Sequence, residues 1–461
     1  MWRWGFILAV KDRAGVRFGG ERSGGVAVPV LKFHWWEFSW HCAVHVRRRI
    51  SELEKEQKRV MNTVKIYTSE NLYSKEISAA KSINLTKPKT NSSWKMSGLN
   101  LQNFVGNIYL SGIDNNFLKK KIGKDKFSIS QVMASPLVFN DNIIFADDTG
   151  TIFSINQRGK INWKKNIYKK IYKKIYKHLS FSIYKDKIYI ADNIGFIYAI
   201  SSESGKLIWL KNYEIPIKSN IKIFDNKIFV INQDNRLLCL DIEKGSKIWD
   251  VRSISSFIKS QNFLALAISK EGDLVTLNSS GDLLKIKANN GQVYWSLNTT
   301  GPTAALDNVF FKSSEIVISD NDIIFSVSSL IFSVNLSNGY LNWQIDIGSK
   351  NTPIIDGNNI FLISDNGYYV NLDRNSGKII WSTNILKILK KKKQMTQITG
   401  FIMGSGKIYA TTLNGYLIVC SAVSGNIEYF KKIGNQITAA PIINDGSLYI
   451  LTENSRILGF N

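Results

Sequence analysis

Histidine and cysteine are scarce in this chain of 461 residues. After residue 60 the only histidine is His178, which argues against a Ser-His-Asp triad or a multi-histidine metal site. Cys239 and Cys420 fall on predicted strands of different units, so no disulfide framework is implied. The sequence also has no glycine-rich phosphate loop of the P-loop or dinucleotide type. We therefore expect a non-catalytic scaffold or binding module with no metal and no cofactor.

The first 60 residues differ in composition from the rest of the chain. They hold eight arginines and five of the twelve tryptophans, whereas the remainder is rich in lysine, asparagine and isoleucine. We interpret residues 1–60 as a foreign or wrongly started segment that is disordered, with Met61 as an alternative start. Residues 61–92 are then a linker, and residues 93–461 form the folded domain.

No targeting or metal-binding function is assigned to the first segment. The cluster His34, His41, Cys42 and His45 has no second Cys/His pair at a recognised spacing, so a chance cluster is favoured. The apolar stretch Gly5–Val10 is too short for the core of a signal peptide and far too short to span a bilayer.

The main feature of the remaining chain is a glycine followed four residues later by a tryptophan, repeated at intervals of 38 to 48 residues. A period in this range is typical of one supersecondary unit that is repeated. The copies are Gly159…Trp163, Gly205…Trp209, Gly245…Trp249, Gly291…Trp295, Gly339…Trp343, Gly377…Trp381 and a weakened copy, Gly425…Tyr429.

Each copy follows short β-branched and aromatic runs that are separated by Asn, Asp and Gly turn residues. Such runs predict antiparallel strands joined by tight turns. Eight units are counted, beginning near Ser135, Leu179, Ile221, Leu264, Glu315, Pro353, Ile398 and Ala440. Four strands per unit predict an all-β fold, an eight-bladed β-propeller of four-stranded antiparallel blades.

The last unit ends at Asn461 after three predicted strands, and an incomplete blade would leave an open edge. We expect an N-terminal strand to close the ring by pairing with this blade. The predicted segment runs from Ser93 to Leu110 and contains Trp94, a tryptophan that no repeat accounts for.

The tryptophans are interpreted as structural residues that wedge between neighbouring blades. Burying 150–250 Å² of each indole stabilises the fold by about 4–6 kcal/mol as an upper bound. An apolar residue stands two places before most of them and is expected to share the strand face of the indole. The predicted structural residues are Trp94, Trp163, Trp209, Trp249, Trp295, Trp343, Trp381 and Tyr429, with the apolar positions Ile161, Leu207, Val293, Leu341, Ile379 and Ile427, and Lys247 as the exception.

Two inserts are rich in lysine. Residues 164–177 contain a near-perfect four-residue repeat of isoleucine, tyrosine and two lysines, and Lys390–Lys393 form a second run. Basic residues interleaved with tyrosine could bind nucleic acid or anionic lipid. A solvated loop is the favoured interpretation, and no nucleic-acid partner is expected.

The repeats have the form [Ser/Asn]-Gly-x-[Ile/Leu]-x-Trp after an Asp/Asn-Gly hairpin, and they resemble the pyrroloquinoline-quinone-like propeller repeat. Eight blades, a Ser-x-Trp segment before the first blade and the absence of cofactor residues most resemble the BamB family of outer-membrane protein assembly factors. The resemblance covers about residues 93–461. It implies a periplasmic, lipoprotein-like scaffold, peripheral to the outer membrane, that docks on the insertase BamA and other assembly-complex subunits and also contacts unfolded outer-membrane proteins.

The resemblance also implies a docking position. In that family the contact comes from loops after the blade that corresponds to the third one here, which points to Phe257, Ile258 and Lys259. An ordinary interblade loop is an equally good interpretation of these residues. An acidic contact of the next loop has no clear counterpart, because Asp307 is the only acid within Thr303–Lys312. Cys42 follows Trp40-His41 and does not fit the box of a lipidated cysteine.

Two alternative functions remain open from the sequence. A quinone-dependent dehydrogenase would share the repeat but typically carries an adjacent cysteine pair and calcium-binding acids, whereas Cys239 and Cys420 are solitary. A cytosolic WD40-type interaction hub would have aspartate after the tryptophan, and only Trp249-Asp250 fits that pattern.

Overall fold

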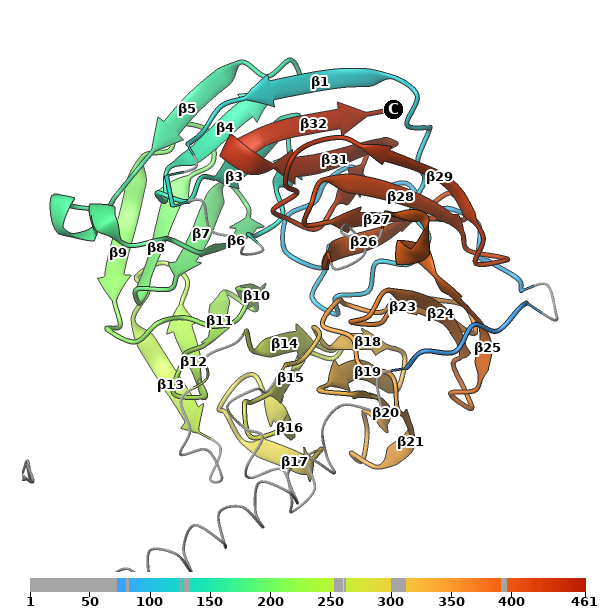
Figure 1. The fold of residues 1–461 in the computed structure, drawn as a ribbon. Helices are drawn as coiled ribbons and strands as arrows, with labels where there is room; N and C mark the ends of the chain where they lie inside the picture. Colours follow the sequence, from blue (N-terminus) through green and yellow to red (C-terminus); the bar gives the residue numbers. More distant parts are fainter. Residues whose placement is uncertain are drawn as a thin grey trace, which may run out of the picture. The chain divides into compact units, whose positions relative to one another are not determined.

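Each repeat folds into one four-stranded antiparallel sheet, and eight such blades surround a central channel (Figure 1). The computed structural model describes residues 73–79, 83–124, 126–127, 133–252, 260, 263–299, 312–390 and 396–461. The chain divides into two compact units, Met1–Glu70 and Asn71–Asn461, and the first lies outside the described residues. The predicted eight-bladed β-propeller is confirmed.

In blades 1 to 7 the strands follow the chain from the inner to the outer edge, whereas in blade 8 the outer strand is β1, which comes first in the chain. Blades 1 to 4 consist of β2 (Leu137–Phe139), β3 (Asn142–Ala146), β4 (Ile152–Asn156) and β5 (Ile161–Lys165); β6 (Leu179–Tyr184), β7 (Lys187–Asp192), β8 (Phe196–Ser201) and β9 (Leu207–Asn212); β10 (Lys222–Phe224), β11 (Lys227–Ile231), β12 (Arg236–Asp241) and β13 (Lys247–Arg252); and β14 (Ala265–Ile268), β15 (Asp273–Leu277), β16 (Asp282–Lys287) and β17 (Val293–Asn298).

Blades 5 to 8 repeat this arrangement. They consist of β18 (Val317–Ser319), β19 (Asp322–Val327), β20 (Leu330–Asn335) and β21 (Leu341–Ile345); β22 (Ile354–Asp356), β23 (Asn359–Ile363), β24 (Tyr368–Asp373) and β25 (Ile379–Asn384); β26 (Ile398–Gly404), β27 (Lys407–Thr412), β28 (Tyr416–Ser421) and β29 (Ile427–Lys432); and β30 (Ile442–Asn444), β31 (Ser447–Thr452), β32 (Arg456–Phe460) and β1 (Asn116–Lys121). The described residues also form the short 3-10 helices η2 (Lys170–Lys174), η5 (Ile385–Ile388) and η6 (Glu453–Ser455).

Turn residues account for the hairpins. Asn140 and Asp141 join β2 to β3 with φ values of 46° and 60°, a left-handed conformation that Asn and Asp tolerate and that suits a two-residue hairpin. The Oδ1 atom of Asp192 accepts the backbone amides of Ile194, Gly195 and Phe196 at 2.8 to 2.9 Å. The carboxylate therefore satisfies the backbone donors of the turn between β7 and β8.

The apolar cores lie between neighbouring blades. One cluster joins Val275 of blade 4 to Phe325 of blade 5, and another joins Tyr189 of blade 2 to Val230 of blade 3. Because each blade buries its faces against two neighbours, the ring is stabilised as a whole and needs a complete eighth blade.

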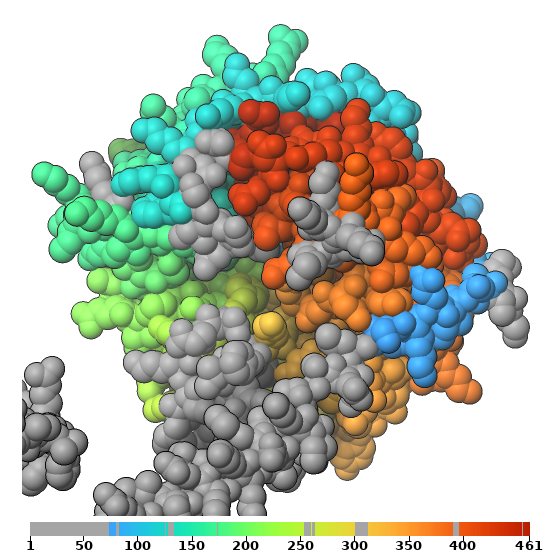
Figure 2. Space-filling view, viewed as in Figure 1, coloured from blue at the N-terminus to red at the C-terminus, as the bar shows by residue number. Residues whose placement is uncertain are grey.

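The pairing of β1 with β32 completes that blade, with Lys119 opposite Leu458 and Lys121 opposite Arg456. The strand order is β1-β32-β31-β30, so an N-terminal strand closes the ring as predicted. Figure 2 shows the early residues of the chain beside its C-terminal residues at this position. The predicted segment was wrong, because the closing strand begins at Asn116 and lies downstream of residues 93–110.

Residues 94–111, here called the plug, instead cross the channel. The plug makes hydrogen bonds with the inner strands, or the turns that follow them, in seven blades. The bonds join the Trp94 amide to the Val138 carbonyl (2.7 Å), the Ile183 amide to the Lys95 carbonyl (2.7 Å), the Lys222 ammonium to the Ser97 carbonyl (3.0 Å), the Ile268 amide to the Leu101 carbonyl (2.9 Å), the Ile318 amide to the Gln102 carbonyl (2.9 Å), the Ser405 amide to the Ile108 carbonyl (2.8 Å) and the Ser111 amide to the Gly446 carbonyl (3.0 Å).

Blade 6 meets the plug through Phe104, which packs against the cluster that contains Ile355. Upstream residues also lie on this blade: the amide of Ile77 donates to the Ser382 carbonyl at 3.0 Å, and the amide of Thr86 donates to Asp356 Oδ2 at 2.8 Å. The plug thus touches every blade, which ties the ring together from the inside.

Candidate functional site

The repeated tryptophans pack against the glycine of the next blade. A Cβ atom placed on that glycine would lie 2.5 to 2.9 Å from an indole carbon, which is too close for any side chain. The pairs are Trp163 with Gly205, Trp209 with Gly245, Trp249 with Gly291, Trp295 with Gly339, Trp343 with Gly377 and Trp381 with Gly425. The glycine in the second to seventh copies of the motif therefore receives the indole of the preceding blade.

The indole N–H groups add a polar contact to this packing. Five of them donate to a backbone carbonyl two or three residues before the receiving glycine, as is usual for a buried indole. The bonds are Trp163 to Ser202 (3.0 Å), Trp209 to Ile242 (3.1 Å), Trp249 to Asn289 (3.1 Å), Trp295 to Leu336 (3.1 Å) and Trp343 to Arg374 (2.9 Å).

Three of the six apolar residues that stand two places before the repeated aromatic residue do not share the buried face that the sequence predicts, whereas Leu207, Ile379 and Ile427 are half-buried against core clusters. Ile161, Val293 and Leu341 are 43%, 42% and 45% exposed. The register shifts at this point, as between Ser154 and Ile155 opposite β5, so one extra residue separates the apolar position from the tryptophan. A β-bulge of this kind reverses the two-residue alternation, which is why the prediction was wrong here.

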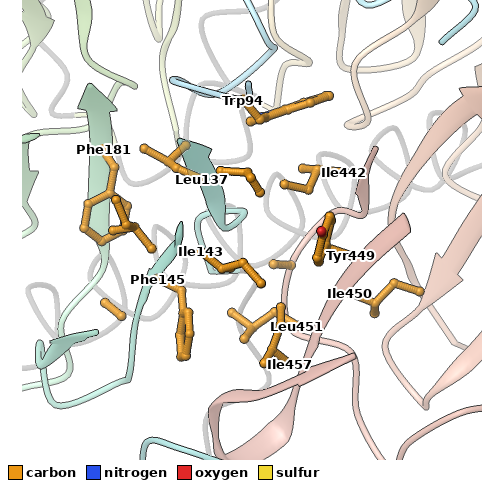
Figure 3. Packing of buried hydrophobic residues seen from close by; sticks show 14 of the residues in the cluster. Trp94, Leu137, Ile143, Phe145, Phe181, Ile442, Tyr449, Ile450, Leu451 and Ile457 are labelled. Atoms are coloured by element: carbon orange, nitrogen blue, oxygen red, sulfur yellow. The ribbon is translucent and has the colours of Figure 1, made fainter. Parts of the chain in front are cut away.

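Trp94 and Tyr429 differ from the other predicted blade aromatics. Trp94 belongs to the plug and lies near Leu137 of blade 1 and Ile442 of blade 8 in one apolar cluster (Figure 3). Tyr429 is 42% exposed, because the eighth blade offers no Gly-x-x-x-Trp turn to receive it. Its place in the pattern did not predict this exposure.

Next to the plug, the channel contains a cavity of about 510 Å³. Every blade contributes a residue that stands beside its inner strand, and Ser97 of the plug also lines the cavity. These residues are Ser135, His178, Asn220, Phe263, Glu315, Thr352, Thr399 and Ala440. The repeat thus assembles a wall of polar and apolar residues from positions that are far apart in the sequence.

Lys222 connects the cavity wall to the plug. Its side chain is fully buried, and its Nζ atom donates to the carbonyls of Ser97 and Asn100 at 3.0 and 2.8 Å and to Asn103 Oδ1 at 2.6 Å. Three acceptors satisfy the three donors of an ammonium group. Burial nevertheless lowers the pKa of Lys222 to about 8, although the nearby Glu315 carboxylate opposes this shift.

Glu315 is the acid of the cavity wall. Its Oε1 atom accepts from Asn220 Nδ2, and Asn220 Nδ2 also donates to Ser97 Oγ at 2.8 Å. Burial raises the pKa of Glu315 to about 7, against the opposing effects of the Lys222 charge and of the Asn220 hydrogen bond. This acid links blades 3 and 5 to the plug.

Three basic side chains, Lys312, Lys350 and His178, also line the cavity. Lys350 Nζ donates to Gln397 Oε1 at 2.7 Å, and burial lowers the pKa of Lys350. Burial lowers the pKa of His178 to about 4, so its imidazole is neutral at pH 7. These side chains can form hydrogen bonds and ion pairs with a ligand. They do not form a pair of a nucleophile and a general base.

The donor set does not fit a quinone cofactor with calcium. Among the described residues that line the cavity, Glu315 is the single carboxylate, and its charged neighbour is the ammonium of Lys222. Within the described ranges no group of three or more His, Cys, Asp or Glu residues could hold a metal ion. Cys239 and Cys420 are buried free thiols on β12 and β28, in different blades.

Some predicted residues lie outside the described part of the chain. These are the docking candidates Phe257, Ile258 and Lys259, the acid Asp307, and the cluster His34, His41, Cys42 and His45. Conversely, Lys222, Asn103 and Glu315 were not identified from the sequence. The signal that could have identified Lys222 is a lysine at the start of an otherwise apolar inner strand, Lys222-Ile223-Phe224.

Comparison with known proteins identifies relatives of the ring. A family model described as outer membrane protein assembly factor BamB matches residues 148–383, just over half of the chain. Outer membrane protein assembly factor BamB of Moranella endobia is 20% identical over 58% of this chain and 71% of its own length. The uncharacterized protein RP232 of Rickettsia prowazekii is 24% identical over 72% of this chain and 83% of its own length.

Solved structures share the architecture. BamB from Moraxella catarrhalis has a TM-score of 0.59 at 12% identity, covering 75% of this chain and 100% of that chain. Quinohemoprotein alcohol dehydrogenase from Comamonas testosteroni has a TM-score of 0.61 at 12% identity, covering 80% of each chain. At these identities the likeness concerns the fold alone. No helix in the described residues is long and apolar enough to cross a membrane.

Proposed function

Because this chain belongs to the family of outer membrane protein assembly factor BamB, we propose that it is a non-catalytic scaffold of the machinery that inserts β-barrel proteins into the outer membrane. In this proposal the protein works in the periplasm, at the outer membrane. The match of the family model over residues 148–383 is the observation that carries the proposal.

The architecture supports a scaffold. The plug joins all eight blades, and β1 closes the ring against β32, so the interblade loops are presented by a rigid support. Loops on a rigid scaffold are a common place for partner contacts. A quinone-dependent dehydrogenase shares the fold, but the single carboxylate beside Lys222 does not supply the acids that calcium needs.

We place the contact to the insertase BamA in the loop that follows β13 of blade 3, at Phe257, Ile258 and Lys259. An apolar residue followed by a basic one suits a small interface in which an apolar anchor is buried and a charge is paired at its rim. Other subunits of the complex and unfolded outer-membrane proteins are further proposed partners.

The test is capture of BamA from detergent-solubilised envelopes by the tagged full chain. Ile258→Asp with Lys259→Glu should lower the captured amount at least about tenfold, as expected for an interface hot spot. The matched control is Ile248→Asp with Lys244→Glu, which changes exposed residues of the same blade in the same way. Equal capture by both variants would remove the docking assignment, and no capture by the unaltered protein would remove the proposed function.

A further inference from the structure

The lysine-rich insert of residues 164–177 is a folded loop between β5 and β6. The ring of Tyr168 is 8% exposed, and its hydroxyl donates to Asp192 Oδ2 at 2.6 Å. Tyr172 packs edge-on against Phe196, with ring centroids 5.4 Å apart. The tyrosines of the repeat therefore point to the protein and hold the insert against blade 2.

Lys177 fixes the same insert from within. Its side chain is 1% exposed, its Nζ atom donates to the carbonyls of Tyr172 and Ile175, and it lies 5.0 Å from the centroid of the Tyr168 ring. The backbone amide of Lys177 donates to the Asp148 carbonyl at 3.1 Å. The insert is thus an ordered element held by side-chain and backbone contacts, contrary to the interpretation of these residues as a solvated loop.

The outer side of this element has an unusual composition. Ile171 is 77% exposed and Ile175 is 44% exposed, while Lys169, Lys170 and Lys174 are exposed around them. Residues 164–177 contain seven lysines and no aspartate or glutamate. Figure 1 shows η2, which carries Lys170–Lys174, projecting from the rim of the ring. Lys169, Lys170, Ile171, Lys174 and Ile175 are here called the basic tip.

Two kinds of anionic partner are consistent with the charge of the basic tip, and the tyrosines distinguish them. Single-stranded nucleic acid is usually bound by aromatic rings on which bases stack. Tyr168 and Tyr172 use their rings for packing against the protein, and Tyr176 packs edge-on against Phe127 at 6.3 Å. What remains at the surface is isoleucine among lysines, a pattern that suits the interface of an anionic bilayer.

We propose that the basic tip is a contact site for the surface of an anionic lipid bilayer. The three lysines pair with headgroup phosphates, and Ile171 enters the boundary between headgroups and acyl chains. Because the tip is anchored by Tyr168 and Lys177, little conformational freedom is lost on binding. The site is independent of the docking loop after β13, so it stands or falls separately from the proposed function.

The test is co-sedimentation of the full chain with vesicles of phosphatidylethanolamine and phosphatidylglycerol. Lys169→Gln, Lys170→Gln and Lys174→Gln together should weaken the partition coefficient at least tenfold, since a lysine near such a surface contributes about fivefold. Ile171→Asp should weaken it about tenfold, because the loss of apolar insertion adds to charge repulsion. Added salt should reduce the lysine contribution.

Matched variants separate the tip from the general positive charge of the chain, including its first 60 residues. Lys206→Gln, Lys211→Gln and Lys244→Gln remove the same charge from exposed positions, and Ile208→Asp changes an isoleucine that is 44% exposed on β9. These controls should bind vesicles like the unaltered protein. Melting temperatures of all variants should agree, since none removes Tyr168 or Lys177.

Equal loss in the tip variants and the controls would overturn the proposal, because binding would then reflect net charge alone. Unchanged vesicle binding by the tip variants would overturn it as well. The same holds if the tip variants lose affinity for a single-stranded oligonucleotide and keep their affinity for vesicles. A loss that is confined to the tip variants and to anionic vesicles, and is absent with neutral phosphatidylcholine, supports it.

Discussion

The indole of Trp209 in blade 2 lies against Gly245 of blade 3, so closely that a Cβ atom on Gly245 would sit 2.5 Å from the indole Cζ3. Gly245 also has a φ of +63°, in the left-handed region that glycine adopts without strain. Its backbone conformation and the close approach of the ring require glycine for separate reasons. The same relationship recurs between successive blades and explains why glycine and tryptophan repeat together.

Gly245→Ala should therefore destabilise the fold by about 2–4 kcal/mol, from backbone strain and from overpacking against Trp209. The measurement is chemical denaturation of the full chain. Gly357→Ala is the matched control, because Gly357 has a φ of +56° but a Cβ there would meet only the Thr86 methyl group at 3.8 Å. The control should cost only about 1–2 kcal/mol of strain. Equal costs would show that the indole contact does not restrict position 245.

The closing strand gives a second prediction. Leu118 on β1 is 3% exposed and lies against Gly159, in the place that a tryptophan occupies in the other blades. Leu118→Ala should lower the free energy of unfolding by about 2–5 kcal/mol, because it leaves a cavity in the last blade.

Lys119→Ala is the control for this variant, since Lys119 is exposed on the same strand and its backbone pairing with Leu458 is kept. It should change stability by less than about 0.5 kcal/mol. A Leu118 variant as stable as this control would contradict the role of β1 as the strand that closes the ring.

The cavity acid and the cavity histidine predict opposite pH dependences. Burial raises the pKa of Glu315 to about 7, so its contribution to stability is present below its usual pKa of 4.5 and is lost as pH rises from 4.5 to 7. Burial lowers the pKa of His178 to about 4 from 6.5, so the unfolded chain binds the extra proton and stability rises between pH 4 and 6.5.

Relative to the unaltered protein, Glu315→Gln should therefore become more stable as pH rises from 4.5 to 7. His178→Gln should become relatively less stable as pH rises from 4 to 6.5. Thermal unfolding at several pH values measures both differences against the unaltered chain, which cancels the contribution of groups that do not interact with the substituted side chain. Lys222 is the exception in Glu315→Gln, because the Glu315 carboxylate acts on its pKa. Parallel curves for the three proteins would contradict the partly buried placement of these two side chains in the channel wall.

The repeat predicted the blades because its glycine and tryptophan are the residues that pack neighbouring blades against each other. The seven copies, six with tryptophan and one with tyrosine, mark the outer strands of the first seven blades, and the eighth blade was counted from its remaining strands. Trp94 is also a tryptophan, but no glycine stands four residues before it. Its neighbours Leu137 and Ile442 come from the first and last blades. Its position depends on the closed ring, which no local pattern describes.

The hydrogen bonds inside the channel could not be predicted either, because they join residues that are far apart in the sequence. Asn103 accepts from Lys222, and Asn220 donates to Glu315, across 119 and 95 positions of the sequence. The plug has no alternating strand pattern, since its partners are backbone groups of inner strands that lie around a ring. The bulge before each tryptophan was also missed, because Ile161 and Leu341 look like buried strand residues until the extra residue is counted.

We propose that this ring is a scaffold that binds the insertase BamA. Isothermal titration of the full chain with the purified soluble part of BamA from the same organism tests it directly. We expect saturable binding with one copy of each protein. The double variant Ile258→Asp with Lys259→Glu should bind more weakly, and the control Ile248→Asp with Lys244→Glu should bind like the unaltered protein. Absence of binding by the unaltered protein at the highest soluble concentrations would contradict this proposal.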